Sequence, residues 1–210
     1  MAIDTPQAPP RRPSNAKVRL LQVADELFYS DGINSVGIDR IIAEAGVTKA
    51  TFYKQYGSKD TLILEYIAGR DQQIRSALVD LTASAPRPQD VLAALVDAVV
   101  ADTARTNFRG DPFINASAEF ARPDHPVRQA VAEHRDWFTG FLEDQLRRSG
   151  HPQPGAAADE FYVLRDGAMA GAYSGDVIAA TSAFVRGASR ILSEAGVESR
   201  SADADEAPFD

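Results

Sequence analysis

The sequence contains no cysteine, and it has only one tryptophan and two methionines among 210 residues. Without cysteine the chain has no disulfide framework, no thiolate metal ligand and no cysteine nucleophile. Long apolar runs are lacking too, since none approaches the roughly 18 residues that a membrane-spanning helix needs. The first residues are polar and rich in proline, unlike the apolar segment of a secretory signal. We therefore expect a cytoplasmic protein.

Histidine is also scarce, and the three copies are His125, His134 and His151. His125 and His134 are nine residues apart, which is not the i, i+4 spacing of two zinc ligands on a helix. The chain shows no Ser-His-acid set, no paired-carboxylate motif and no glycine-rich phosphate loop. We expect no catalytic site, no metal and no cofactor. Turnover of a substrate by pure protein would revive the alternative of an enzyme.

The net charge of −8 at first disfavours a nucleic-acid partner. The two signs are unevenly distributed, however. Residues 1–60 hold eight Lys and Arg against seven Asp and Glu, whereas residues 61–210 hold 14 against 23. All four lysines lie in the first part: Lys17, Lys49, Lys54 and Lys59. This pattern favours a small DNA-binding module attached to an acidic body.

The stretch 38–62 has the pattern of two helices joined by a tight turn and followed by a longer helix. Apolar residues at three-and-four spacing predict the first helix over 38–45. Gly46 is suited to the left-handed conformation that ends a helix at low cost. Thr48 is a good N-cap for a second helix over 49–56. The segment is therefore a candidate helix-turn-helix.

The outward face of the second helix carries side chains that donate hydrogen bonds. We assign Lys49, Ala50 and Thr51 to base edges, because lysine favours guanine and a small alanine permits close approach or contact with a thymine methyl. Phosphate contacts position such a helix without reading sequence. We assign them to Thr48, Tyr53, Lys54 and Lys59. Lys17 is expected to reach a phosphate, and Arg40 either contacts DNA or is plain surface charge.

Two interpretations stay open for each of three cations, Lys59, Arg11 and Arg12. Lys59 lies in the first turn of the third helix of the segment, where its charge opposes the helix dipole. A phosphate alongside would offset that cost, and the alternative is a solvated surface lysine. Arg11 and Arg12 lie in the proline-rich stretch 1–14, which we expect to be a disordered arm. The arm either follows DNA, along the backbone or in a minor groove, or is a solvated tail.

The whole chain is predicted to be all-α, with about nine helices and no strand alternation or internal repeat. Outside the helix-turn-helix, apolar periodicity predicts helices over 15–31, 58–83, 89–105, 113–121, 127–149, 156–172 and 176–195. Gly196 is expected to end the last helix, and 197–210 to be a disordered acidic tail. We expect a DNA-binding domain over 15–60 and a second helical domain over 61–196.

One combination of residues and spacings is specific. It consists of Ile41, Ala45-Gly46-Val47-Thr48-Lys49, Thr51-Phe52-Tyr53, Tyr56 and Ser58-Lys59. On this basis, residues 15–65 resemble the tetracycline-repressor (TetR) family of bacterial transcriptional regulators. Two positions depart from the family pattern. Ile42 stands where alanine is usual, which predicts local repacking, and Gly37 stands where threonine or serine is frequent, which removes one expected phosphate contact.

The resemblance implies a homodimer that binds palindromic double-stranded DNA, in most members as a repressor. It also implies that the last two helices pair with their symmetry mates. The alternative is that the small residues of those helices serve a purely internal core. Finally, the resemblance implies that a small-molecule effector binds in the C-terminal domain. The candidate effector contacts are Phe108, Phe113, Trp137, Phe141, Tyr162, Arg165, Met169 and Tyr173. Core packing is the alternative for each of them. Two alternative functions stay open for this chain. It could be a DNA-binding dimer without an effector, or a helical scaffold that has lost DNA binding.

Overall fold

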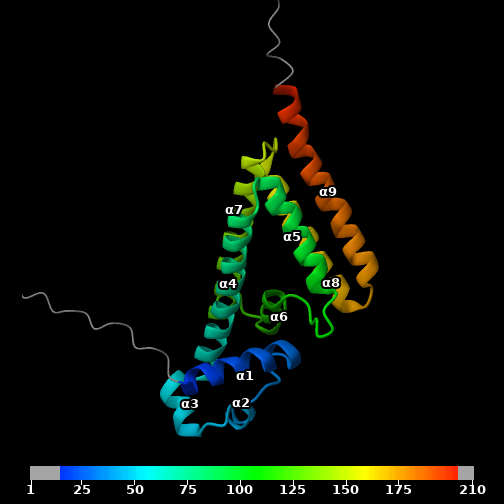
Figure 1. The fold of residues 1–210 in the computed structure, drawn as a ribbon. Coiled ribbons are helices and arrows are strands. Elements are labelled where there is room, and N and C mark those ends of the chain that lie inside the picture. The colour runs from blue at the N-terminus through cyan, green and yellow to red at the C-terminus, as the bar shows by residue number, and fades with distance from the viewer. Residues whose placement is uncertain (1–14, 203–210) are drawn as a thin grey trace, which may run out of the picture. The chain divides into compact units, whose positions relative to one another are not determined.

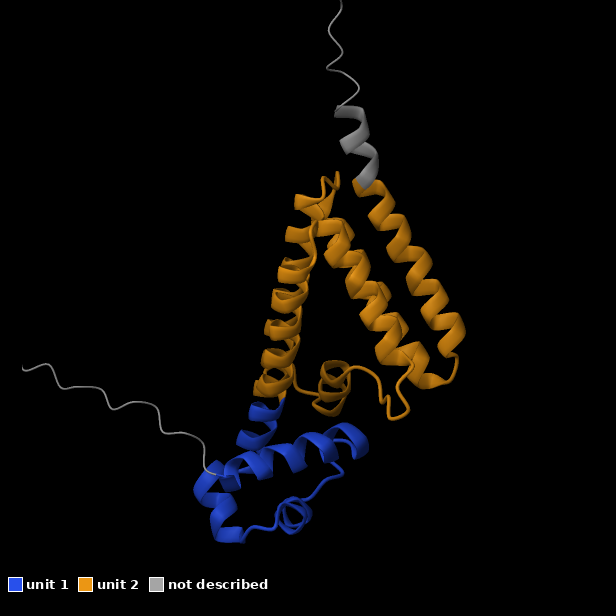
Figure 2. Cartoon of the chain, in the orientation of Figure 1, with its two compact units in different colours: residues 1–66 blue, residues 67–210 orange. Residues whose placement is uncertain are grey.

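The computed structural model describes residues 15–202, with side chains described for residues 15–195 (Figure 1). Over this range the chain forms nine helices and no strand, so the all-α prediction is confirmed. None of the described helices is long and apolar enough to cross a membrane. Arg11, Arg12 and residues 203–210 lie outside the described range. The chain divides into unit 1, Met1–Tyr66, and unit 2, Ile67–Asp210 (Figure 2).

Unit 1 is built from three helices and the start of a fourth: α1 (Asn15–Asp31), α2 (Ile38–Ala45), α3 (Lys49–Tyr56) and α4 (Lys59–Ser84). Their apolar faces meet in one core. It contains Leu20, Ala24, Leu27, Phe28, Ile33, Val36, Ile41, Ala45, Phe52, Tyr56, Leu62, Ile63 and Tyr66. The short helices α2 and α3 are too short to be stable alone, so burial against α1 and α4 holds them in place.

Local signals in the sequence explain where α2 ends and α3 begins. Gly46 adopts φ 61° and ψ 42°, the left-handed conformation that non-glycine residues adopt only with strain. Its N–H and that of Val47 donate to the last carbonyls of α2. Thr48 then caps α3, because its hydroxyl accepts a hydrogen bond from the Thr51 N–H at 3.2 Å. The predicted turn is confirmed residue by residue.

Gly37 at the start of α2 offers a stabilising substitution. It is the N-cap residue, it has an extended backbone (φ −79°, ψ 153°), and it supplies no side-chain cap. A Cβ built there meets nothing within 4 Å. We expect Gly37→Thr to raise the free energy of unfolding by about 0.5–1 kcal/mol, through a new cap and a less flexible unfolded chain. Urea unfolding followed by circular dichroism measures this.

The same substitution at Gly46 is the matched control. Threonine there would have to adopt a positive φ, which costs roughly 1–2 kcal/mol. Gly46→Thr should therefore destabilise the protein, although a Cβ at Gly46 also meets nothing within 4 Å. A loss of stability for Gly37→Thr would show that the start of α2 is not a cap.

Unit 2 contains the rest of α4 and five further helices. These are α5 (Pro88–Thr103), α6 (Pro112–Glu119), α7 (Pro126–Arg148), α8 (Pro154–Ser174) and α9 (Val177–Ala202). Proline at the first helical position begins α5, α6, α7 and α8, where its missing N–H costs no hydrogen bond. The buried core includes Leu92, Phe138, Leu142, Phe161 and Phe184.

The predicted end of the last helix is wrong. α9 continues through Gly196 to Ala202, so residues 197–202 are helical rather than part of a disordered tail. An isolated glycine inside a helix costs about 1 kcal/mol relative to alanine but does not by itself end the helix. No proline follows within the next residues to stop it.

The small residues of α8 and α9 bring these two helices of one chain close together. A Cβ built on Gly171 would lie 3.0 Å from the Cβ of Ala180, and one on Gly187 would lie 2.5 Å from Leu164. Ala168, Ala172 and Ala188 are buried. These small residues therefore allow α8 and α9 of one chain to pack closely. Pairing of the two helices with a second copy stays a prediction.

Candidate functional site

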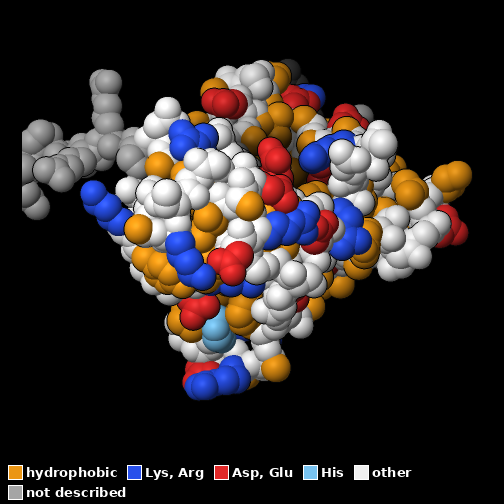
Figure 3. Space-filling view, turned by 90° about the horizontal axis from the view of Figure 1, so that it is seen from below, with side chains coloured by type: hydrophobic (Ala, Val, Ile, Leu, Met, Phe, Trp, Pro, Cys, Tyr) orange, Lys and Arg blue, Asp and Glu red, His pale blue; other side chains and the backbone are white. Residues whose placement is uncertain are grey.

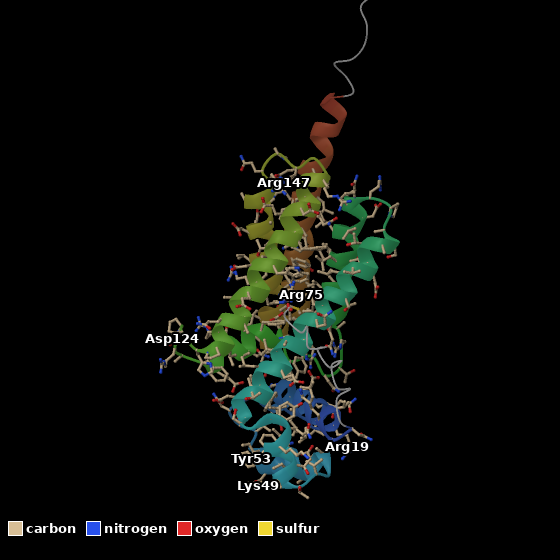
Figure 4. The ribbon with its side chains drawn as sticks, turned by 90° about the vertical axis from the view of Figure 1, so that its left-hand side faces the viewer. Arg19, Lys49, Tyr53, Arg75, Asp124 and Arg147 are labelled. Carbon is tan, nitrogen blue, oxygen red and sulfur yellow. The ribbon has the colours of Figure 1, made fainter. Side chains whose placement is uncertain are left out.

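Helix α3 presents one buried face and one exposed polar face. Phe52 is fully buried and Tyr56 nearly so, whereas Tyr53 is 47% exposed. Lys49 and Tyr53 lie at the outer edge of unit 1 (Figure 4). They are one helical turn apart, and Lys54, the next residue of α3, is also exposed. The Tyr53 ring meets Phe52 edge to face with centroids 5.3 Å apart. This contact holds Tyr53 against the core while its hydroxyl end stays open to a partner.

The exposed face differs in how its donors are engaged. Lys49 Nζ donates to Asp39 Oδ1 at 3.1 Å, and this hydrogen bond raises the pKa of Lys49. The Thr48 and Thr51 hydroxyls are 2.9 Å apart, so part of the hydrogen-bonding capacity of Thr51 is used in the cap. Among the described residues, Lys54 has no hydrogen-bond or ion-pair partner. Lys54 is therefore a donor of α3 that a phosphate can meet without breaking another contact, as is the Tyr53 hydroxyl.

Three other predicted DNA contacts have partners inside unit 1. Lys59 Nζ donates to the Ile33 carbonyl at 2.6 Å. Lys17 forms an ion pair with Glu65 at 2.8 Å. Arg40 lies between two carboxylates, with its nitrogens 2.5 Å from Asp31 and 2.9 Å from Glu44. Phosphate contacts by these residues stay predictions, and each would have to exchange an internal partner for the phosphate.

The view of Figure 3 shows how the charges are arranged on the face seen from below. Lys and Arg side chains are interspersed with Asp and Glu and with apolar side chains, rather than gathered in one basic patch. Sequence reasoning missed the acidic partners that produce this pattern. Asp39, for example, stands ten residues before Lys49, and only the tight turn between α2 and α3 brings the two together.

The eight predicted effector contacts of unit 2 lie in different environments. Phe113, Tyr162, Arg165 and Met169 are buried, Phe108, Trp137 and Phe141 are half-buried, and Tyr173 is 44% exposed. Burial raises the pKa of Tyr162 to about 12, so its phenol is neutral at ordinary pH. Tyr173 receives a hydrogen bond from Arg109, whose guanidinium also lies over its ring.

Arg165 has a structural partner that sequence reasoning missed. Its Nη2 lies 2.5 Å from Asp111 Oδ2, and both side chains are buried. Asp111 is also the N-cap of α6, where Oδ1 accepts from the N–H groups of Phe113 and Ile114. Burial alone would raise the pKa of Asp111, but Arg165 and these donors outweigh it and hold the pKa below its usual range. The Asp-Pro pair at 111–112 is a helix-start signal that could have indicated this cap.

A second buried polar contact joins α4 to α7. His134 Nδ1 lies 2.7 Å from Asp71 Oδ1, and its ring stacks on Phe113 with centroids 3.6 Å apart. Burial lowers the pKa of His134, although Asp71 opposes the shift. Since a carboxylate only accepts, Nδ1 carries the proton. The histidine is thus a structural residue of the core.

The hollows of unit 2 include the following three. The one between α4 and α7 has a volume of about 460 Å³ and is lined by Trp137 and Phe141 among others. A second, of about 190 Å³, is lined by Phe113 and Tyr162. A third, of about 320 Å³, lies beside His151. Each of the first two hollows is thus lined by two of the predicted effector contacts.

Comparison with known proteins decides the family. The sequence model of the family described as bacterial regulatory proteins, tetR family, matches residues 20–66. The crystal structure of SCO4454, a TetR-family transcriptional regulator from Streptomyces coelicolor, is 39% identical in sequence, covers 86% of this chain and 96% of its own, and superposes with a TM-score of 0.82. The chain belongs to the TetR family.

More distant TetR relatives agree. The HTH-type transcriptional regulator LmrA of Bacillus subtilis is 25% identical over 65% of this chain and 73% of its own length. Regulatory protein TetR from Rhodobacter sphaeroides shares the fold with a TM-score of 0.75, at 24% identity over 85% of this chain and 99% of its own. The chain is thus a TetR-family DNA-binding transcriptional regulator, and this family consists of regulators rather than enzymes.

Proposed function

We propose that this regulator is a cytoplasmic repressor that binds a palindromic operator as a homodimer and leaves it when a small molecule binds unit 2. One observation carries the DNA-binding half of this proposal. Helix α3 buries Phe52 and Tyr56 and presents Lys49, Tyr53 and Lys54 outward. Eight helical residues span about 12 Å, which matches a major groove about 12 Å wide.

The exposed face of α3 has separate groups of residues for base contacts and for phosphate contacts. Lys49, Ala50 and Thr51 at the start of the helix would contact base edges, as is usual for the N-terminal end of a recognition helix. Tyr53, Lys54 and the other predicted phosphate contacts would fix the orientation of the helix without reading sequence. One such helix covers few base pairs, so useful specificity requires two copies about one or more helical turns apart.

Exposed apolar side chains on the last two helices support a dimer. Val163 on α8 is 61% exposed, Ile178 on α9 is 80% exposed, and Val177 and Val185 are also exposed. Since small residues already join α8 to α9 inside the chain, these larger side chains are the ones available to a second copy. Pairing of two such helix pairs would form a four-helix bundle.

The regulatory half of the proposal requires an effector that prefers one dimer arrangement over another. In one arrangement the two α3 helices would fit successive major grooves, and in the other they would not. An effector that favours the second arrangement weakens operator binding. A coupling free energy of roughly 1–3 kcal/mol corresponds to about a 5- to 150-fold loss of affinity. The second candidate is a DNA-binding dimer without an effector. A thermal-shift screen separates the two, because a specific ligand raises the melting temperature by mass action.

Two lysine substitutions test the proposed contacts of α3. Lys54→Ala should weaken binding to all DNA sequences alike and lower the salt dependence by about one phosphate contact. Lys49→Ala should instead relax the preference at one base position. The operator is first selected from random duplex DNA, and affinities for operator and random DNA are then compared at several salt concentrations.

The matched control is Arg122→Ala, an exposed cation of unit 2 that pairs with Asp124. It should leave DNA binding unchanged. If Lys49→Ala lost affinity equally for operator and random DNA, the assignment of Lys49 to a base edge would be wrong. If neither lysine mattered, α3 would not be the recognition helix.

A further inference from the structure

The hollow between α4 and α7 has the composition of a ligand site. Its floor is aromatic, since the Trp137 and Phe141 rings stack with centroids 6.3 Å apart. Leu78, Val79 and Ala83 of α4 form its apolar wall. Its volume of about 460 Å³ lies within the range of small-molecule pockets, roughly 300–1,000 Å³. Arg75, labelled in Figure 4 where α4 passes α7, lies at one side of this hollow.

One buried polar atom in the hollow lacks a hydrogen bond. The Gln145 side chain is 2% exposed, and its Oε1 has no partner among the described residues. Its Nε2 faces Asp144 Oδ2 at 3.4 Å, so the carboxylate sets the orientation of the amide. A buried acceptor without a donor is costly. Because Gln145 lines the hollow, a ligand donor that reaches this buried oxygen would supply the missing hydrogen bond.

The charged groups of the hollow are already compensated within the protein. Arg75 donates to Asp71 at 2.5 Å, and its guanidinium lies 3.9 Å above the Trp137 ring. Arg148 is 3.6 Å from Asp144. A charged ligand would therefore lose its hydration without gaining a free counter-charge. This arrangement favours a neutral ligand over an ionised one.

We propose that the α4–α7 hollow binds a neutral, flat aromatic molecule that packs against the Trp137 and Phe141 side chains and donates one hydrogen bond to Gln145. The same helix α4 begins in unit 1 at Lys59 and contributes Leu78 and Val79 to the hollow. Use of the hollow as the effector site rests on the proposed function, because it requires a repressor that binding can release. The binding site itself does not depend on that function.

Two probes that share the naphthalene ring test the proposal on the full chain. 2-Naphthol is neutral and donates one hydrogen bond, whereas 2-methoxynaphthalene has no donor. Calorimetry should show one 2-naphthol bound per chain, about tenfold more tightly than 2-methoxynaphthalene. Trp137 is the only tryptophan of the chain, so its single indole N–H resonance reports the site directly. That resonance should shift on titration with 2-naphthol.

Substitutions locate the bond. Gln145→Leu removes a buried unpaired acceptor, so the protein should remain folded and the preference for 2-naphthol should disappear. Gln129→Leu, an exposed glutamine of the same helix, is the control and should change nothing. No binding, no shift of the Trp137 resonance, or an unchanged preference in Gln145→Leu would each overturn the site. Tighter binding of the anion 2-naphthoate would overturn the proposed ligand class.

Two measurements separate other outcomes. Val79→Lys places a charge at the 67% exposed rim and should weaken 2-naphthol binding without changing the sedimentation of the protein. A changed oligomeric state would show that a second copy covers the hollow, which overturns the ligand site. Operator binding is measured in the same samples without probe. Its absence would contradict the proposed function while leaving the naphthol result intact, and intact operator affinity at saturating 2-naphthol would overturn the effector role alone.

Discussion

Replacing Asp111 by alanine is expected to lower the free energy of unfolding of unit 2 by about 3–5 kcal/mol. The substitution removes the 2.5 Å ion pair with Arg165 and both hydrogen bonds that cap α6. It leaves the buried Arg165 guanidinium with Asp166 as its remaining carboxylate partner, at 3.0 Å. The cost is large because the buried guanidinium loses its closest carboxylate, and Asp166 alone compensates its lost hydration less well.

Urea unfolding followed by Trp137 fluorescence measures this loss, since the only tryptophan lies in unit 2. Asp124→Ala is the matched control, because its ion pair with Arg122 is exposed on both sides. It should leave the unfolding transition nearly unchanged, because solvent screens an exposed ion pair. Equal effects of the two substitutions would show that the Asp111–Arg165 pair is not buried as described.

The effect of Asp111 should also depend on pH. The folded-state pKa of Asp111 lies below its ordinary value of 3.8. Near and below pH 3.8, the Asp111 carboxylate therefore binds a proton more readily in the unfolded chain than in the folded one. The contribution of the carboxylate is fully present above pH 3.8 and is lost as the pH falls through the folded-state pKa. The difference in unfolding free energy between wild type and Asp111→Ala should therefore narrow as the pH falls below 3.8 and through the folded-state pKa.

Phe52→Ala is expected to destabilise unit 1 by about 3–5 kcal/mol, because it empties the centre of a small core. Phe52 is 0% exposed and is the main apolar anchor of α3. A unit of this size buries little surface, so such a loss is a large share of its stability. Helical circular dichroism should show early unfolding, while Trp137 fluorescence should still report a later transition for unit 2.

Tyr53→Ala is the neighbouring control and separates folding from DNA binding. Tyr53 is 47% exposed, so its loss should cost little stability beyond the edge contact with Phe52. It should nevertheless weaken binding to operator and random DNA alike, as expected for a phosphate contact. Strong unfolding by Tyr53→Ala, or normal stability of Phe52→Ala, would mean that the two faces of α3 are assigned the wrong way round.

The parts of the fold that depend on local signals could be predicted from the sequence. Gly46 favours the end of α2 because few other residues adopt its positive φ, and Thr48 favours the start of α3 because its hydroxyl reaches the Thr51 N–H. Phe52 and Tyr56 lie four residues apart, the spacing of one helix face, and both are buried. Gly196 shows the limit of such signals, since a glycine permits a helix to end but does not require it.

Contacts between distant residues could not be predicted in this way. Lys59 donates to Ile33, which is 26 residues earlier, and Arg165 pairs with Asp111 across 54 residues. Neither pairing has a periodicity that one sequence reveals. The aromatic residues of unit 2 posed the same difficulty, because helical spacing marks a side chain as inward but does not say which cavity it reaches.

The ion pair between Lys49 and Asp39 has a consequence for how the protein searches DNA. Asp39 already neutralises Lys49, so Lys49 displaces fewer of the cations condensed on a duplex when the two meet. Lys17 and Arg40 are neutralised in the same way. Fewer released counterions mean weaker attachment to arbitrary DNA and a shallower dependence on salt than four lysines would suggest. Residence on non-cognate sequence should then be brief, and discrimination should come from the contacts that only the operator completes.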